Sequence, residues 1–206
     1  MLHMKQRVDI MVDLETLGLE QGATIFQIAA AAFDIATGEI VATFDKVASI
    51  YCTNDLKIEG KTLEFWLNNN RDLFFKLQER ADGCPNQLVS DFWRWLSVFT
   101  DQEDADVFLW GNGILNDNAW LKHAFNENGL DYPIFFRNNR DVRTLREAVE
   151  MKVSIEGRTF SYEKVGELHD AMDDVRSQVN MVVEMYRVLV GDVTKAGRVQ
   201  KVDVAP

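Results

Sequence analysis

Cysteine, proline and histidine are scarce in this sequence of 206 residues, which contains two, three and three of them respectively. Cys52 and Cys84 lie outside any CxxC pair, so their spacing supports neither a disulfide framework nor a cysteine-ligated zinc site, and it fits a reducing compartment. So few prolines leave no proline-rich linker at which a domain boundary could fall. We therefore expect residues 1–206 to form a single domain, with a loosely ordered tail at 191–206.

Positive charge and long apolar runs are also lacking. The 22 Lys and Arg residues against 33 Asp and Glu residues give a net charge of −11, which argues against a protein that coats nucleic acid or membrane by bulk charge. No apolar run approaches the roughly 18 residues of a membrane span, and Asp9, Asp13 and Glu15 interrupt the one nearest the N-terminus, unlike a signal peptide. We expect a soluble, cytoplasmic protein without membrane contacts that holds any anionic substrate locally.

Hydrophobic residues make up 47% of the chain, as in an ordinary globular protein, and their spacing predicts the main elements. Alternating or continuous apolar runs predict strands, and a period of 3.6 residues predicts helices. The expected strands are 8–12, 25–33, 40–48 and 107–110, and the expected helices are 62–67, 87–99, 118–128, 141–151 and 173–190. Three strands as a meander, then a strand alternating with helices, predict an α/β domain with a mixed parallel and antiparallel sheet flanked by helices.

Two acids stand at the end of the first expected strand. Asp13 and Glu15 are two residues apart, so an extended chain points both carboxylates to the same side of the sheet. Two converging carboxylates in a cleft repel one another, and a divalent metal is the simplest source of neutralisation. In a chain with 33 acids this spacing also arises by chance, and surface acids remain the alternative interpretation of the pair alone.

The flanking residues strengthen the metal interpretation. The segment 8–19, VDIMVDLETLGL, resembles the first motif of the DEDD 3′–5′ exonucleases, and 110–121, WGNGILNDNAWL, resembles the second, with Asp117 as its acid. The segment 169–174, HDAMDD, resembles the third motif in its histidine version. The segments 62–67 and 140–145 are similar to a branch that contains phage exonuclease A and the mycobacterial-type exoribonuclease domain. One departure is Asn116, where the family more often has phenylalanine.

This resemblance implies a ribonuclease H-like fold and hydrolysis that depends on two divalent ions, Mg²⁺ or Mn²⁺. It implies that Asp13, Glu15, Asp117 and Asp174 hold the ions, and that His169 is the general base. Carboxylates suit magnesium or manganese, and the ordinary pKa of histidine, about 6.5, suits proton transfer near neutral pH. The resemblance also implies a cytoplasmic setting in a bacterium or a phage-infected cell. His3 and His123 are interpreted as surface or packing residues.

Six further residues are candidates for contacts to nucleic acid. The resemblance implies that Thr16 and Leu17 line the path of the 3′ end, with Asn112 from the second motif, while Trp66 offers a ring on which a base could stack. The segment 137–164 carries seven basic residues against five acids, which favours Arg140 and Arg143, with Arg137, for phosphate contacts; solvated surface arginines are the alternative. Core packing is expected for Trp93, Trp95 and Trp120.

Two adjacent acids, Asp173 and Asp174, compete for the role of metal ligand after His169. If one helix ran through all three residues, the period would place Asp173 on the side of His169 and Asp174 well away from it. The resemblance instead places the histidine before the helix and assigns Asp174. We follow the motif, because Ala171 also falls at its place in it.

The combined pattern predicts a metal-dependent 3′–5′ exonuclease that acts on 3′ ends of single-stranded DNA and releases nucleoside 5′-monophosphates. An exoribonuclease of the same mechanism is the first alternative, and a non-catalytic nucleic-acid-binding module is the second. The five motif residues argue against a binding module, which has no need of all of them. No GxxxxGK[ST] sequence is present, which excludes a phosphate-loop nucleotidase. The sequence leaves the oligomeric state open.

Overall fold

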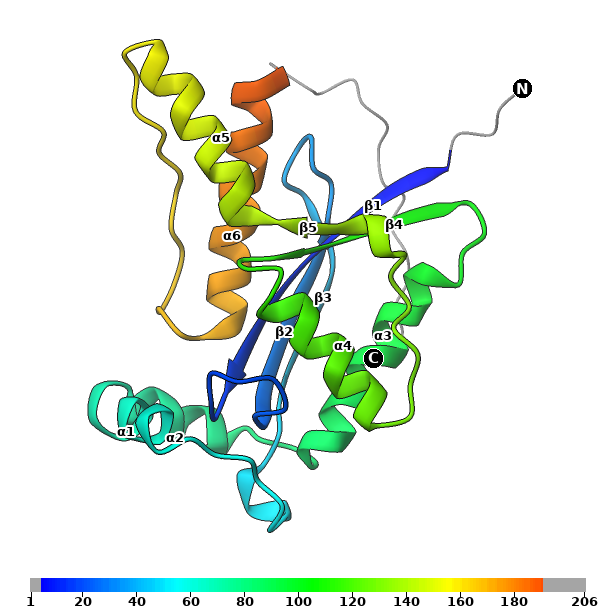
Figure 1. Ribbon diagram of the computed structural model, residues 1–206, viewed down its shortest axis with the longest axis vertical. Helices are drawn as coiled ribbons and strands as arrows, with labels where there is room; N and C mark the ends of the chain where they lie inside the picture. Colours follow the sequence, from blue (N-terminus) through cyan, green and yellow to red (C-terminus); the bar gives the residue numbers. More distant parts are fainter. Residues whose placement is uncertain (1–4, 191–206) are drawn as a thin grey trace.

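The computed structural model describes residues 5–190, and its centre is a five-stranded sheet with the order β3-β2-β1-β4-β5 (Figure 1). The first three strands form the expected antiparallel meander, and β4 and β5 continue the sheet in parallel with β1. The strands are β1 (Gln6–Thr16), β2 (Ile25–Phe33), β3 (Ile40–Val47), β4 (Ala105–Gly111) and β5 (Asn139–Asp141). The mixed sheet confirms the predicted fold class.

Alternation along β1 and β2 divides the core into two layers. Ile10, Val12 and Ile28 face one layer, which α3 (Pro85–Thr100) and α4 (Asp117–Glu127) cover. Met11 and the alanines of β2 at alternate positions face the other layer, which α5 (Val142–Ile155) and α6 (Ala171–Val190) cover. Both faces of the central strands are therefore buried, which explains why β2 is apolar at every position except Gln27.

A third cluster lies beyond the ends of β1 and β2, where α1 (Gly60–Asn69) and α2 (Arg71–Glu79) pack together (Figure 1). Its centre is formed by Leu17, Phe26, Trp66 and Phe74, all buried. The helix α2 was not predicted, and α1 is longer than predicted. The short 3₁₀ segments η1 (Ile50–Cys52) and η2 (Phe136–Asn138) complete the elements.

Cys52 and Cys84 form a disulfide, with a Cα–Cα distance of 5.6 Å, so the expectation of no disulfide is wrong. The pair is separated by 32 residues, and only the folding of η1 against the start of α3 brings the cysteines together. The expected tail, 191–206, lies outside the described residues. Within residues 5–190, none of the helices combines the length and the apolar character needed to cross a membrane.

Candidate active site

Asp13 and Glu15 lie on the face of β1 that is directed toward α6. The two-residue period places them on the same side as Met11, which packs in the layer under α5 and α6. Their cross-strand partners on β2 are Ala29 and Gln27. Because alanine is small, the cross-strand neighbour of Asp13 leaves room beside the carboxylate. The predicted same-sided orientation of the two acids is confirmed.

Asp117 reaches the same region from the other side of β1. It is the first residue of α4, which begins just after β4 ends at Gly111. A Cβ atom at Gly111 would lie 2.9 Å from the Cβ of Asp117 and 2.4 Å from Oδ1 of Asn118, closer than real atoms approach. Glycine at this position therefore allows the start of α4 to sit against the end of β4, next to β1.

His169 precedes α6 and has a left-handed backbone with φ of 69°. Histidine adopts this conformation uncommonly, and here it turns the chain into α6. The backbone N–H of His169 donates to Oδ2 of Asp174 at 3.0 Å, while the N–H of Ala171 donates to Oε1 of buried Gln27 at 3.4 Å. The His169 ring packs edge-on against Phe65 of α1 at 5.2 Å. Strand β2 and helix α1 thus position the third motif.

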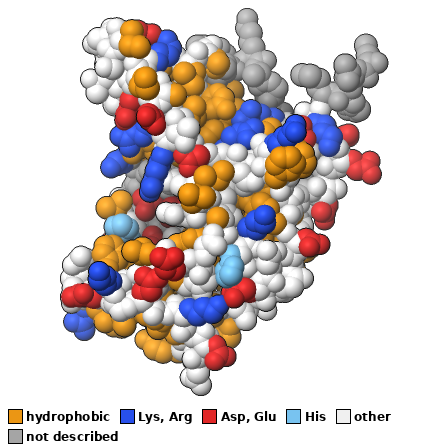
Figure 2. All heavy atoms as spheres, viewed as in Figure 1, with side chains coloured by type: hydrophobic (Ala, Val, Ile, Leu, Met, Phe, Trp, Pro, Cys, Tyr) orange, Lys and Arg blue, Asp and Glu red, His pale blue; other side chains and the backbone are white. Residues whose placement is uncertain are grey.

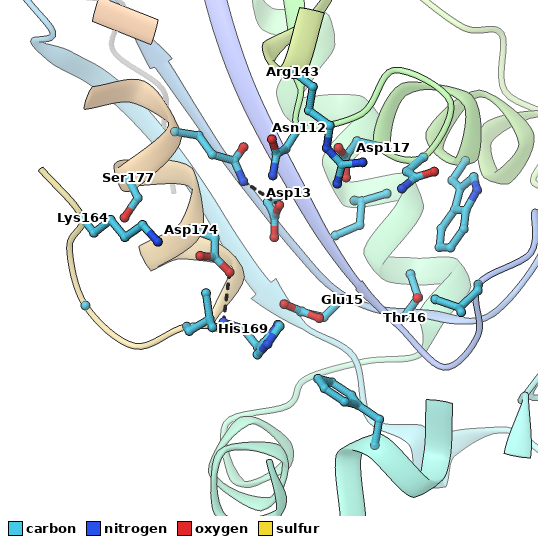
Figure 3. A pocket seen from close by; sticks show the side chains of 18 of the residues that line it. Asp13, Glu15, Thr16, Asn112, Asp117, Arg143, Lys164, His169, Asp174 and Ser177 are labelled. Carbon is cyan, nitrogen blue, oxygen red and sulfur yellow. Dashed lines mark hydrogen bonds between the residues drawn. The ribbon is translucent and has the colours of Figure 1, made fainter. Parts of the chain in front are cut away.

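These side chains share one cleft of about 670 Å³, to which four carboxyl groups, three Lys or Arg side chains and His169 contribute (Figure 3). Figure 2 shows acidic side chains at the bottom of the hollow on this face. The ligand atoms of Glu15, His169 and Asp174 all lie within 4.8 Å of one another, a spacing at which they could hold a metal ion. The structure therefore brings together Asp13, Glu15, Asp117, His169 and Asp174, although they come from three distant parts of the chain.

Burial and mutual repulsion act on the carboxyl groups of the cleft. Burial, reinforced by the charge of Asp117, raises the pKa of Asp13 well above its usual range, and burial and the charge of Asp13 do the same for Glu15. Burial raises the pKa of Asp117 to about 7, opposed by backbone N–H donors and by Arg143. Burial also raises the pKa of Asp174. A divalent cation would relieve this accumulation of negative charge.

The raised pKa values predict that the metal-free protein loses stability as the pH rises. An acid whose pKa is higher in the folded than in the unfolded state binds more protons when folded, so its contribution falls as the pH rises through the folded pKa. For Asp117 that window runs from about 4, its unfolded value, to about 7. Melting temperatures measured in EDTA should therefore be lower at pH 8 than at pH 5.5.

The same comparison should be made on an Asp13→Asn/Asp117→Asn double variant, which removes two of the acids that bind the extra protons. Its melting temperature should depend less on pH over this range. A wild-type protein in EDTA that is equally stable at both pH values would contradict the prediction.

The six predicted substrate residues divide into two groups. Thr16, Asn112 and Arg143 line the cleft, and Figure 3 shows Arg143 pointing toward Asp117. Leu17 is only 1% exposed, because its side chain packs in the cluster under α1 rather than along the cleft. Arg140 also lies outside the cleft: it donates to the carbonyl oxygen of Arg137 at 2.7 Å and stacks over Phe108.

Trp66 also differs from its predicted role. It borders the cleft, but it is only 1% exposed and its indole N–H donates to the carbonyl oxygen of Thr16 at 3.1 Å. Its ring therefore supports the wall of the cleft and has no free face for a base. Phe65 and Trp120 line the cleft and are only partly buried, so the expectation of core packing is wrong for Trp120. The helical spacing of Trp120 could not show that this side of α4 borders a cleft.

Four polar residues of the cleft, Lys61, Lys164, Ser177 and Gln178, were not singled out in the sequence as site residues. Lys61 comes from α1, Gln178 comes from α6, and Lys164 comes from the segment that joins α5 to α6. Ser177 fixes that segment, because its hydroxyl group accepts from the N–H of Val165 at 2.9 Å and donates to its carbonyl oxygen at 3.2 Å. Figure 3 shows Lys164 directed toward Asp174. The excess of basic residues over 137–164 was the one sequence signal for Lys164.

Comparisons with known proteins agree with this geometry. A family model described as "3′-5′ exoribonuclease Rv2179c-like domain" matches residues 8–186. No curated protein matches the chain significantly. Among solved structures, the nuclease domain of 3′hExo, a DEDDh family member bound to rAMP, has a TM-score of 0.58 at 16% identity, over 87% of this chain and 92% of that one.

Two other solved structures are also similar. Cell-death related nuclease 4 (CRN-4) has a TM-score of 0.61 at 14% identity, over 92% of this chain and 67% of that one. E. coli Exonuclease I in complex with a dT13 oligonucleotide has a TM-score of 0.61 at 15% identity, over 88% of this chain and 41% of that one. These similarities confirm the expected ribonuclease H-like fold.

Proposed function

Because the chain belongs to the family of 3′–5′ exoribonuclease Rv2179c-like domains, we propose that it hydrolyses single-stranded nucleic acid from the 3′ end and releases nucleoside 5′-monophosphates. The observation that carries the proposal is the convergence of Asp13, Glu15, Asp117, His169 and Asp174 on one cleft. These residues come from three segments, and at least one further strand lies between each segment and the next in the chain. Only the folded structure therefore brings them together.

The donor set fits divalent metal ions. The cleft offers carboxylate oxygens, the ligands that Mg²⁺ and Mn²⁺ prefer, and burial has raised the pKa of each of the four acids. We propose that Asp13, Glu15, Asp117 and Asp174 hold two such ions. When bound, the ions would neutralise charge on the phosphoryl group and on the departing 3′ oxygen.

The residues of the chain would supply the remaining chemistry. His169 would accept the proton of the attacking water, since its ring nitrogen lies within 4.8 Å of carboxylate oxygens of Glu15 and Asp174, the acids proposed to hold the ion. Phe65 and Trp120 would stack on the terminal bases, which tolerates any sequence. Lys61, Arg143 and Lys164 would contact phosphates and so provide the positive charge that the acidic chain lacks overall.

The resemblance of segments 62–67 and 140–145 to the branch that contains phage exonuclease A supports DNA as the preferred substrate, as does the fold similarity to E. coli Exonuclease I, which was solved with a dT13 oligonucleotide. The description of the matching family supports RNA, which is therefore the second candidate. A choice between them depends on contacts to the 2′-hydroxyl group of the terminal sugars.

The test is digestion of 5′-labelled oligonucleotides of matched DNA and RNA sequence. Each strand is prepared with a free 3′ end and with a protected 3′ end, and each is digested with Mg²⁺, with Mn²⁺ and with excess EDTA. Stepwise shortening of the unprotected 5′-labelled strands is expected with either ion, together with release of 5′-monophosphates and a higher kcat/KM on DNA. Full hydrolysis in EDTA would refute the metal assignment, and a higher kcat/KM on RNA would make the second candidate the correct one. Shortening of 3′-protected strands from within would contradict exonuclease action.

A further inference from the structure

Gln178 lines the cleft, but none of the roles proposed above for metal binding or proton transfer is assigned to it. It lies on α6 four residues after Asp174, so the helix presents both side chains on one face. Its amide nitrogen donates to Oδ1 of Asp13 at 2.9 Å, the contact marked by the dashed line at Asp13 in Figure 3. Among residues 5–190, this is the only hydrogen bond from a side chain to the Asp13 carboxylate.

The other end of the same amide has no partner. Gln178 is only 5% exposed, yet its Oε1 atom is buried without a hydrogen-bond donor. Buried acceptors are nearly always paired, so an unpaired one beside a cluster of acids indicates a donor that arrives with a ligand. Asn180, two residues further along α6, shows the contrast, because it is outside the cleft and bonds to the carbonyl oxygen of Glu163.

An amide is chemically suited to this place. A lysine would neutralise Asp13 and compete with a cation, and a glutamate would add a further negative charge to the cleft. An amide N–H instead orients the carboxylate without altering its charge, and each carboxylate oxygen has a second lone pair that stays free for a metal ion. The contact therefore holds Asp13 in one orientation and leaves it able to bind.

We propose that Gln178 is a positioning residue for the metal site. Its amide nitrogen fixes the orientation of Asp13, and its Oε1 accepts a hydrogen bond from a water molecule that enters the cleft with the ion. This rests on the proposed function, since it assumes that Asp13 binds a divalent ion. It goes beyond the five motif residues, because it assigns to α6 a second contribution to the site besides Asp174.

The experiment compares Gln178→Met, which keeps the length of the side chain and removes both polar atoms, with Asn180→Ala as a control on the same helix. Binding of Mn²⁺ to the metal-free protein is measured by calorimetry, and kcat and KM are measured on an oligonucleotide. Gln178→Met is expected to weaken Mn²⁺ binding by about ten- to a hundredfold, as is typical when a partner of a metal ligand is removed. It should lower kcat and leave KM nearly unchanged, while Asn180→Ala behaves as the wild type.

Two further measurements keep the test decisive. Gln178→Ala should weaken Mn²⁺ binding to a similar extent, so the result does not depend on one variant folding. In an Asp13→Asn background, Gln178→Met should have little additional effect on Mn²⁺ affinity, because Gln178 acts through Asp13. Equal Mn²⁺ affinity and kcat in wild type and Gln178→Met would overturn the proposal. Calorimetry needs no substrate, so a wild type that binds Mn²⁺ more tightly than Gln178→Met but hydrolyses nothing would overturn only the proposed function.

Discussion

Replacing Asp13 by asparagine is expected to lower kcat by about a thousandfold or more, because the amide keeps the size of the side chain and removes the charge that holds the metal ion. The same loss is expected for Asp117→Asn. Asp117 is buried and Asp13 is half-buried, and both line the cleft, where the neighbouring carboxylates already occupy positions of their own. The measurement is kcat on a single-stranded oligonucleotide at saturating Mg²⁺.

The metal-free Asp13→Asn protein should at the same time be more stable than the wild type. The pKa of Asp13 is raised by burial and by Asp117, so its charged form is unfavourable in the folded protein and asparagine removes that cost. A melting temperature in EDTA at pH 8 that is higher than that of the wild type would show that lost activity is not lost folding. Asp106→Asn is the matched control, since Asp106 is an exposed acid near the start of β4, away from the cleft. Near-wild-type turnover by Asp13→Asn would contradict the assignment of Asp13 as a metal ligand.

The second large effect separates two neighbouring acids. Asp174→Asn should lower kcat by about a thousandfold and weaken Mn²⁺ binding, whereas Asp173→Asn should keep kcat within about threefold of the wild type. Asp174 lines the cleft and accepts from the backbone of His169. Asp173 points to the other side, where it accepts from the N–H of Glu167 at 2.9 Å and pairs with Arg176 at 3.3 Å.

The pair provides its own control, because the two variants differ by one position and make the same chemical change. Asparagine at 173 can still accept from the N–H of Glu167, so only a small decrease in melting temperature is expected from the lost ion pair with Arg176. Calorimetric titration with Mn²⁺ and kcat should rank the two variants in the same order. The opposite ranking would mean that Asp173, and not Asp174, serves the metal site.

Asp173 and Asp174 also show where periodicity alone is misleading. Helical phase favours Asp173 only if one helix includes His169, but α6 begins at Ala171 and His169 has a left-handed backbone. The motif assigned Asp174, which the structure places in the cleft. A motif is defined by its residues and their spacing, so it applies even where an irregular turn such as that at His169 precedes the helix. Periodicity describes only regular segments, and sites are often built where regular segments end.

The sequence by itself determined the elements whose signal is local. Strand β2 matches its predicted range, and the meander, the parallel β4 and the long α6 follow from apolar patterns that neighbouring residues carry. The three motifs are also legible, since each is a short run of residues. The family and the acids Asp13, Glu15, Asp117 and Asp174 are therefore recognisable from the order of the residues alone.

Only the tertiary structure decided which side chains face the cleft. It buried Trp66 and Leu17, left the rings of Phe65 and Trp120 at the surface of the cleft, and turned Arg140 away. It also joined Cys52 to Cys84 and set Gln178 against Asp13, which are 165 residues apart. Most of these outcomes depend on how one helix packs against a strand or helix distant in the chain, and that of Arg140 depends on the pairing of β5 with β4. The apolar spacing along a helix or strand indicates which of its faces is buried, but it does not indicate which neighbouring element covers that face.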